Sequence, residues 1–284
     1  MAKRIASTVV LWAVILGSLS FFGAHAAVAG VTVVSALALY EFYAMAEKMG
    51  FRPFRWMGLG FGVLFTGVPY YLLAGLSDSV LTGFEPFLFH AALLFGAMLA
   101  TGVRVLGERD ATNRVGTVAS TMLGLLCVPY LLQFLVLILM RNASATENLA
   151  LVLWLVAVSK FCDVGALLTG MAIGRHKMSP VISPKKTWEG AVGGVLVSAG
   201  VGAGIAALAG AHLPESLTPA VAAAVAVPLA VTTIVSDLLE SVLKRWADIK
   251  DSGRMIPGIG GALDLVDSLL LAGPLAYFVF VFLD

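Results

Sequence analysis

Long apolar runs separated by short polar segments make up most of this chain. A helix needs about 20 apolar residues to cross a bilayer, because each residue advances it by about 1.5 Å. By this measure the sequence predicts about nine membrane-spanning helices, and the fifth and sixth are long enough to tilt, break or extend beyond the bilayer. The expected spans are residues 5–23, 27–46, 57–76, 86–103, 115–140, 148–174, 188–210, 218–243 and 262–283.

The composition supports the same class of protein. The chain is 60% hydrophobic and 12% charged, whereas a soluble domain is about 25% charged. We therefore expect an all-α polytopic membrane protein. It would form a single transmembrane domain over residues 1–284, with N-terminal helices in 1–150 and catalytic helices and cytoplasmic loops in 151–284. The first apolar run resembles a signal peptide but exceeds the usual length of about 7–15 residues, so we expect it to be retained.

The basic residues predict the orientation. Sixteen of the 18 lysines and arginines lie at the N-terminus or after the second, fourth, sixth and eighth predicted spans. Because cytoplasmic loops carry an excess of these residues, the N-terminus is expected in the cytoplasm of a multi-pass cell-membrane protein. Glycines four residues apart, at 170 and 174 and at 190 and 194, predict close helix packing. They allow a homodimer without requiring one.

Charged residues concentrate in one segment of this apolar chain. Ten of the 35 lie between Asp237 and Asp267, and charges at membrane depth are costly enough to mark functional sites. At the end of the eighth predicted span and just beyond it, five polar residues share one helix face at helical spacing. They are Asp237, Glu240, Ser241, Lys244 and Asp248. A simple salt-bridge ladder from Glu240 to Lys244 is the alternative explanation.

Two aspartates follow a glycine-rich stretch. Residues 257–261 read Pro-Gly-Ile-Gly-Gly, and Asp264 and Asp267 come next, one helical turn apart. Acidic residues there could simply cap a helix. Together with Asp237 they would also form an oxygen-rich site that suits Mg²⁺, which completes its shell with substrate phosphates.

Two further elements carry charge. Lys160 and Asp163 lie one turn apart inside the sixth span, where they could neutralise each other. Ser183 and Pro184 read as the start of the seventh helix, which would place Lys185 and Lys186 in its first turn. Lysines there oppose the helix dipole, and a bound anion would relieve the conflict. Anchoring at the cytoplasmic face is the alternative.

Other chemistries lack support in the sequence. The four histidines form no metal-ligand spacing, and the serine-hydrolase and zinc-protease motifs are absent. We expect no nucleic-acid partner.

The charged elements resemble those of the phosphatidate cytidylyltransferase (CDP-diacylglycerol synthase) family. Its signature is similar to S-x-x-K-R-x4-K-D-x-G-x3-[LP]-[PG]-H-G-G-x-x-D-R-x-D. The stretches Ser-Pro-Lys-Lys-Thr-Trp-Glu-Gly at 183–190 and Tyr-Glu-Phe-Tyr at 40–43 also look like that family's. The chain matches the signature at Ser241, Lys244, Arg245, Lys250, Asp251, Gly253, Pro257, Gly258, Gly260, Gly261, Asp264 and Asp267.

This resemblance implies a nucleotidyltransferase that makes CDP-diacylglycerol and pyrophosphate from CTP and phosphatidic acid. It implies that Asp237, Asp264 and Asp267 hold Mg²⁺ and act in catalysis with Lys244; a second cation such as K⁺ is left open. The residues expected to bind substrate are Asp163, Lys185, Lys186, Glu240, Ser241, Arg245, Lys250, Asp251, Gly260 and Gly261.

The chain departs from the family pattern at three positions. Ile259 stands for the usual histidine, Leu265 for the usual arginine and Val164 for a threonine. An inactive paralogue is therefore one alternative. A CTP-dependent polyprenol or phytol kinase and a membrane transporter are others; the kinase would release CDP instead of pyrophosphate.

Overall fold

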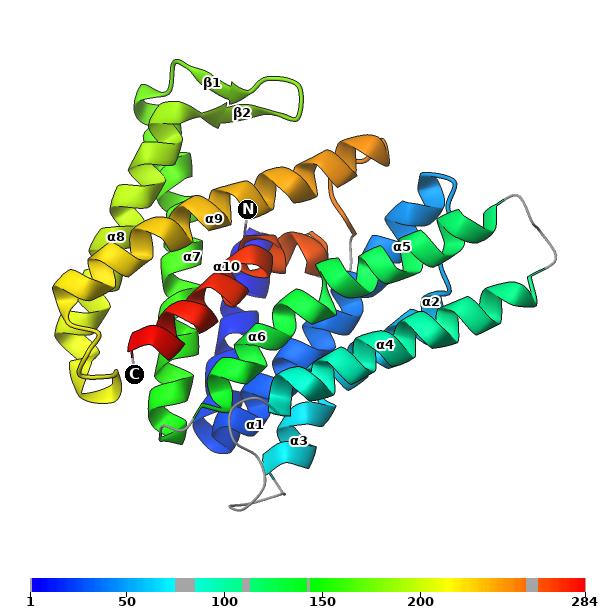
Figure 1. Ribbon diagram of the computed structural model, residues 1–284. Helices are drawn as coiled ribbons and strands as arrows, with labels where there is room; N and C mark the ends of the chain where they lie inside the picture. The colour runs from blue at the N-terminus through cyan, green and yellow to red at the C-terminus, as the bar shows by residue number, and fades with distance from the viewer. Residues whose placement is uncertain (1, 75–84, 109–112, 142–143, 254–259, 284) are drawn as a thin grey trace. The chain divides into compact units, whose positions relative to one another are not determined.

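A computed structural model describes residues 2–74, 85–108, 113–141, 144–253 and 260–283 (Figure 1). These residues form helices and one two-stranded sheet. The helices are α1 (Ala2–Lys48), α2 (Arg55–Thr66), α3 (Val68–Ala74), α4 (Glu85–Leu106), α5 (Arg114–Cys127), α6 (Pro129–Leu139), α7 (Ala145–Ile173), α8 (Trp188–Ala209), the short 3-10 helix η2 (Gly210–His212), α9 (Pro219–Trp246) and α10 (Ala262–Leu283); the strands are β1 (Lys177–Ser179) and β2 (Ser183–Thr187).

Seven helical segments of the described chain are long and apolar enough to cross a membrane. They confirm an all-α polytopic membrane protein, whereas the count of nine spans and the cytoplasmic N-terminus stay predictions. Gly23 interrupts α1 with a non-helical backbone (φ 53°, ψ −129°), at the end of the first predicted span. Another break separates α5 from α6 at Val128, directly before Pro129. Proline cannot donate the backbone hydrogen bond that would continue the helix.

The chain divides into two compact units. The first comprises Met1–Met140 and Trp246–Val266. In its core Tyr43 is fully buried, and its hydroxyl donates to the backbone oxygen of Thr121 over 2.9 Å. This bond satisfies the one polar group of a large apolar side chain, so the ring can anchor α1 against α5.

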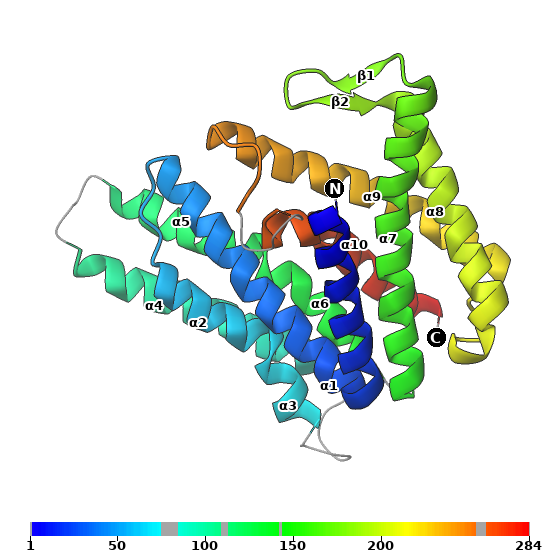
Figure 2. The same ribbon diagram turned by 180° about the vertical axis from the view of Figure 1, so that it is seen from behind.

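The second unit comprises Arg141–Arg245 and Asp267–Asp284. Here α7 and α8 lie side by side (Figures 1 and 2). A Cβ atom at Gly194 of α8 would lie 2.7 Å from the backbone oxygen of Cys162 in α7. At Gly190 it would lie 2.8 Å from the backbone oxygen of Ala166. The expected close packing of helices at these glycines is therefore confirmed.

The start of α8 corrects one sequence-based prediction. Ser183 is not its N-cap, because residues 183–187 form β2 and pair with β1 in an antiparallel hairpin. Thr187 caps the helix instead, accepting a hydrogen bond from Gly190 N over 3.1 Å. Lys185 and Lys186 therefore lie in a strand and do not oppose a helix dipole.

The hairpin is held to α8 by Glu189 in the first turn of the helix. Its carboxylate accepts hydrogen bonds from the backbone nitrogens of Arg175 and His176, each over 3.2 Å, and contacts His176 Nδ1 at 2.5 Å. These contacts hold the residues just before β1 against the first turn of α8.

Candidate active site

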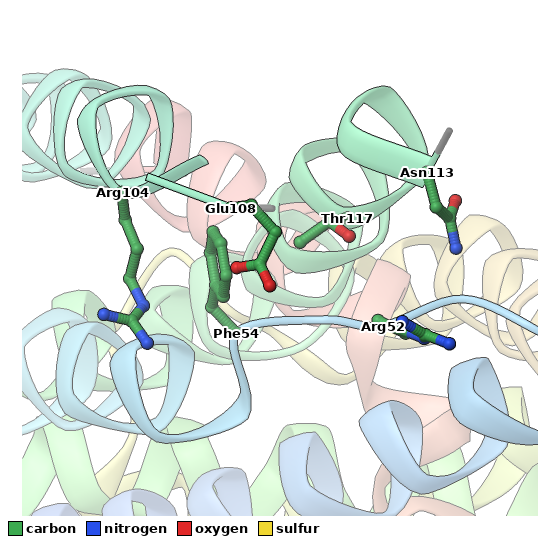
Figure 3. Close-up of a pocket in the computed structure, with 6 residues that line it drawn as sticks. All are labelled: Arg52, Phe54, Arg104, Glu108, Asn113 and Thr117. Carbon is green, nitrogen blue, oxygen red and sulfur yellow. The ribbon is translucent and has the colours of Figure 1, made fainter. Parts of the chain in front are cut away.

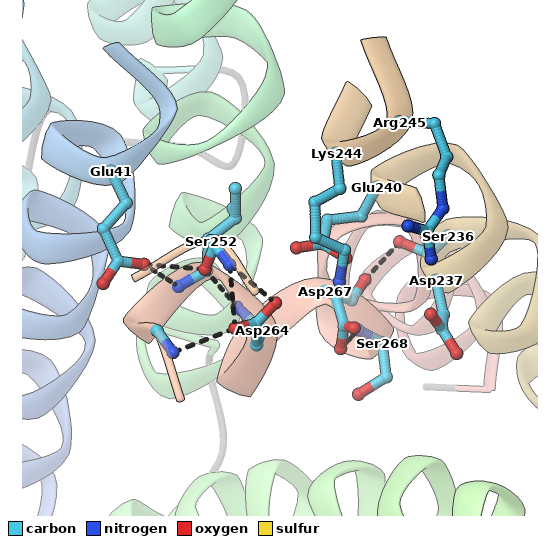
Figure 4. Close-up of polar contacts among 12 residues, drawn as sticks. Glu41, Ser236, Asp237, Glu240, Lys244, Arg245, Ser252, Asp264, Asp267 and Ser268 are labelled. Carbon is cyan, nitrogen blue, oxygen red and sulfur yellow. Dashed lines mark hydrogen bonds and ion pairs between the residues drawn. The ribbon is translucent and has the colours of Figure 1, made fainter. Parts of the chain in front are cut away.

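Three carboxylates of the second unit come together where α9 and α10 meet. Asp237 and Glu240 lie one turn apart on α9, and Asp267 lies on α10 (Figure 4). One oxygen from each lies within 4.8 Å of the others. Glu240 and Asp267 are buried, and Asp237 is half-buried.

The two helices are joined by hydrogen bonds beside this carboxylate cluster. The Ser236 hydroxyl donates to the backbone oxygen of Asp267, and Thr233 Oγ1 donates to the backbone oxygen of Ser268 over 3.3 Å. Ser268 N donates to Asp267 Oδ1 over 2.5 Å. Small hydroxyl residues suit helix contacts in a membrane, because they satisfy polar groups at close range. They fix α10 so that Asp267 faces α9.

The carboxylate cluster fits a divalent cation. Mg²⁺ binds carboxylate oxygens at about 2.0–2.1 Å and keeps waters in its remaining positions. Ligand oxygens on opposite sides of such an ion are about 4.2 Å apart, so oxygens within 4.8 Å of one another need only small side-chain movements to surround it. The predicted ligands Asp237 and Asp267 thus lie together, and Glu240, predicted as a substrate residue, adds a third carboxylate.

Lysines lie against these carboxylates. Lys186 Nζ, from β2, lies 2.6 Å from Asp237 Oδ2, and Lys244 forms an ion pair with Glu240 one turn away on α9. The Lys244 side chain is 13% exposed and that of Glu240 is 2% exposed. Opposite charges this close can bind both a cation and the phosphates that accompany it.

A third lysine approaches from α7. Lys160 Nζ donates to Ser268 Oγ over 2.7 Å and lies 4.0 Å from Asp163 Oδ2. Asp163 and Lys160 therefore form the ion pair expected from their spacing. The bond to Ser268, the residue after Asp267, is a contact that no local sequence pattern indicates.

The other predicted substrate residues of this unit differ in their exposure and contacts. Arg245 is exposed, and its Nε donates to the backbone oxygen of Ile182 over 3.1 Å, so it holds the hairpin to α9. Ser241 is buried, whereas Lys185 is exposed on β2.

Asp264 lies in a different network, within the first unit. Asp264 Oδ2 accepts hydrogen bonds from Ser252 N over 3.1 Å and from Gly261 N over 2.9 Å (Figure 4). Ser252 Oγ in turn donates to Glu41 Oε2 over 2.9 Å. We call these three side chains the Glu41 network. That Asp264 binds metal stays a prediction.

Some of the other motif residues lie next to this network along the chain. Lys250 and Asp251 are exposed directly before Ser252, and Gly260 has φ +118°, a conformation that favours glycine. Leu265 is half-buried and Val164 is 46% exposed. Pro257, Gly258 and Ile259 lie outside the described residues. Sequence reasoning did not assign roles to Glu41 or Ser252, because their partners lie far away along the chain.

A pocket of about 260 Å³ lies elsewhere in the first unit (Figure 3). It contains two arginines and one carboxylate, and no residue predicted for the active site lines it. Its lining residues are Arg52, Phe54, Arg104, Glu108, Asn113 and Thr117. The predicted chemistry therefore does not depend on this pocket.

Several known proteins are similar to this chain in sequence. The model of the cytidylyltransferase family matches residues 2–283. A phosphatidate cytidylyltransferase of Thermotoga maritima is 31% identical over 66% of this chain and 68% of its own. One of Rickettsia bellii is 31% identical over 66% of this chain and 80% of its own. The uncharacterized protein YnbB of Escherichia coli K12 is 33% identical over 76% of this chain and 69% of its own.

The family match covers nearly the whole chain and includes α9 and α10, which carry the carboxylate cluster. It agrees with the apolar helices, which require a lipid bilayer, and with lysines suited to the phosphates of a nucleotide substrate. This chain belongs to the cytidylyltransferase family and is a membrane-embedded nucleotidyltransferase.

Proposed function

We propose that this enzyme transfers CMP from CTP to phosphatidic acid, giving CDP-diacylglycerol and pyrophosphate. The observation that carries the proposal is the carboxylate cluster of Asp237, Glu240 and Asp267 with Lys186 and Lys244 against it. Such a set suits a substrate that brings both a cation and several phosphates. Relatives named phosphatidate cytidylyltransferase favour this lipid over a polyprenol acceptor.

The reaction needs positioning more than proton transfer. A phosphate oxygen of phosphatidic acid attacks the α-phosphorus of CTP, a new P–O bond forms, and the bond to the β-phosphate oxygen breaks. Pyrophosphate leaves with that electron pair. The attacking oxygen is already anionic, so no general base is required, and the enzyme lowers the barrier by aligning the phosphates and neutralising their charge.

The neutralising charge would come from Lys186, Lys244 and Arg245 of the second unit. Lys244 and Lys186 lie against the carboxylate cluster and can bind phosphate oxygens there. Asp237, Glu240 and Asp267 would hold Mg²⁺, which would offset the negative charge of the phosphates. The positive-inside pattern of the sequence supports a location of this chemistry at the cytoplasmic face of the membrane.

The proposal is tested with purified protein in detergent. We would incubate it with α-labelled CTP, phosphatidic acid and Mg²⁺, and measure label in the lipid phase and free pyrophosphate. We expect both, and we expect both to vanish with EDTA. Folded protein that binds CTP but labels no lipid would contradict the proposal. Unlabelled lipid phosphate with CDP as co-product would indicate a kinase instead.

A further inference from the structure

Glu41 is a buried carboxylate that contacts two segments more than 200 residues later in the chain. It lies on α1 and is 3% exposed. Its Oε2 accepts hydrogen bonds from Ser252 Oγ over 2.9 Å and from Leu263 N over 3.0 Å (Figure 4). A carboxylate is costly to bury unless such bonds offset the loss of water. The two bonds therefore explain how α1 can carry this side chain.

Ser252 extends the network to the start of α10. Its backbone nitrogen donates to Asp264 Oδ2 over 3.1 Å, and its hydroxyl accepts from Asp264 N over 3.3 Å. Gly261 N also donates to Asp264 Oδ2, over 2.9 Å. Bonds in both directions fix residues 252 and 261–264 against each other, and Glu41 ties both to α1.

Two motif glycines make room for this carboxylate. A Cβ atom at Gly253 would lie 2.0 Å from Glu41 Oε1, and one at Gly261 would lie 2.4 Å from Glu41 Oε2 and 2.0 Å from Ser252 Oγ. Neither glycine has a positive φ. Space, and not backbone conformation, therefore requires glycine at these two positions.

The held segments carry the family motif. Lys250 and Asp251, which the motif predicts to bind substrate, directly precede Ser252, and α10 continues from Leu263 to Asp267. We propose that Glu41 is a positioning residue for the nucleotide-binding motif: it does not touch the reacting atoms but fixes the turn after Lys250 and Asp251 and the first turn of α10. This inference rests on the proposed function, because it assumes that these motif residues bind CTP.

Two variants of Glu41 separate positioning from loss of folded protein. Glu41→Leu removes the acceptor, and we expect the KM for CTP to rise about tenfold or more, with an unchanged KM for phosphatidic acid. Glu41→Gln keeps one oxygen that can accept both bonds, so we expect its KM for CTP to stay within about threefold of the parent value. A purely structural role would lower kcat through fewer folded molecules and leave KM unchanged.

The matched control is Glu47→Gln, six residues along the same helix. The Glu47 side chain is 46% exposed and its ion pair with Arg55, at 2.6 Å, involves no motif residue. We expect parental kinetics from this variant. A parental KM for CTP in Glu41→Leu, or equal values for the Leu and Gln variants, would overturn the inference.

A double-mutant cycle tests the glycine. Gly253→Ala should raise the KM for CTP in the parent, because the new methyl group displaces the Glu41 carboxylate. In the Glu41→Ala background the same change should add less than about twofold, because the space is then empty. An equal effect in both backgrounds would show that Gly253 is required for another contact, and would contradict the role given to Glu41.

A second measurement needs no activity. Lys250 is exposed, and trypsin should cut after it at least about fivefold faster in Glu41→Leu than in the parent, because loosened segments open more often. Equal cleavage rates overturn the positioning role even if the parent enzyme is active. A parent that labels no lipid contradicts the proposed reaction, while the cleavage rates still test the network.

Discussion

The carboxylate cluster of the second unit and the Glu41 network of the first both contain buried or half-buried carboxylates, but the partners of these carboxylates differ. In the carboxylate cluster, Asp237 and Glu240 face lysine side chains. In the Glu41 network, the carboxylates of Glu41 and Asp264 accept hydrogen bonds from backbone nitrogens and a serine. Flexible lysines can turn to a ligand, whereas backbone donors fix the chain. The first arrangement suits chemistry and the second suits support.

The largest expected effect comes from removing charge from the carboxylate cluster. Asp267→Asn keeps the size of the side chain but removes its charge, and we expect kcat to fall more than about 100-fold, since loss of one preorganised electrostatic group typically costs that much. Initial rates of lipid labelling at saturating CTP provide the measurement.

The control for this variant is Asp248→Asn, also in the charged segment. Asp248 has φ 53°, a backbone conformation that asparagine tolerates as well as aspartate does. Its rate should match the parent. Normal turnover by Asp267→Asn, or an equal loss in Asp248→Asn, would remove Asp267 from the active site.

A second expected effect concerns stability, and it tests whether the lysines in the carboxylate cluster are structural. Lys244→Met takes the ion-pair partner from Glu240, whose side chain is 2% exposed. Breaking one side of a buried pair costs roughly 3–5 kcal/mol of unfolding free energy, whereas neutralising both sides is often harmless. Thermal unfolding in detergent should therefore show a lower Tm for Lys244→Met and recovery when Glu240→Gln is added.

Activity should respond differently from stability in this pair. The double variant is expected to stay inactive, because both charges serve the substrate. Recovery of turnover together with Tm would show that the pair only stabilises the helix. Lys186→Met is the comparison, since its pair with Asp237 is more exposed, at 24% and 27%, and should cost less stability.

The smallest expected effect tests the start of α8. Thr187→Val removes the side chain that accepts from Gly190 N, and loss of such a cap costs about 1 kcal/mol. Ser183→Ala, at the cap that the sequence indicated, should change the Tm less. A larger shift from Ser183→Ala would mean that the helix starts where the sequence suggested and not at Trp188.

Local patterns predicted much of this fold. The expected spans 148–174, 188–210, 218–243 and 262–283 lie within a few residues of α7, α8, α9 and α10, because apolar length is set by the bilayer alone. The hairpin before α8 was missed for the opposite reason. Strand pairing between residues 177 and 187 depends on contacts across a turn, and Ser-Pro is also a common helix start.

The candidate active site was predictable to the extent that its residues share a helix face. Asp237, Glu240 and Lys244 follow helical spacing on α9, so their proximity could be inferred. The Lys160 bond to Ser268, by contrast, joins residues 108 positions apart. No spacing rule reaches that far, and the pairing of Glu41 with Ser252 is hidden in the same way.

The space that Gly253 leaves for Glu41 limits which chimeras between relatives can keep an intact motif. A chimera that joins the C-terminal half of this chain to the first helices of another protein would keep every letter of the motif. Without a carboxylate at the position of Glu41, the chimera would also contain a cavity beside Gly253, and the Ser252 hydroxyl would lose the acceptor that Glu41 provides. To transfer this motif to another protein, Glu41 of α1 would therefore have to be transferred with it.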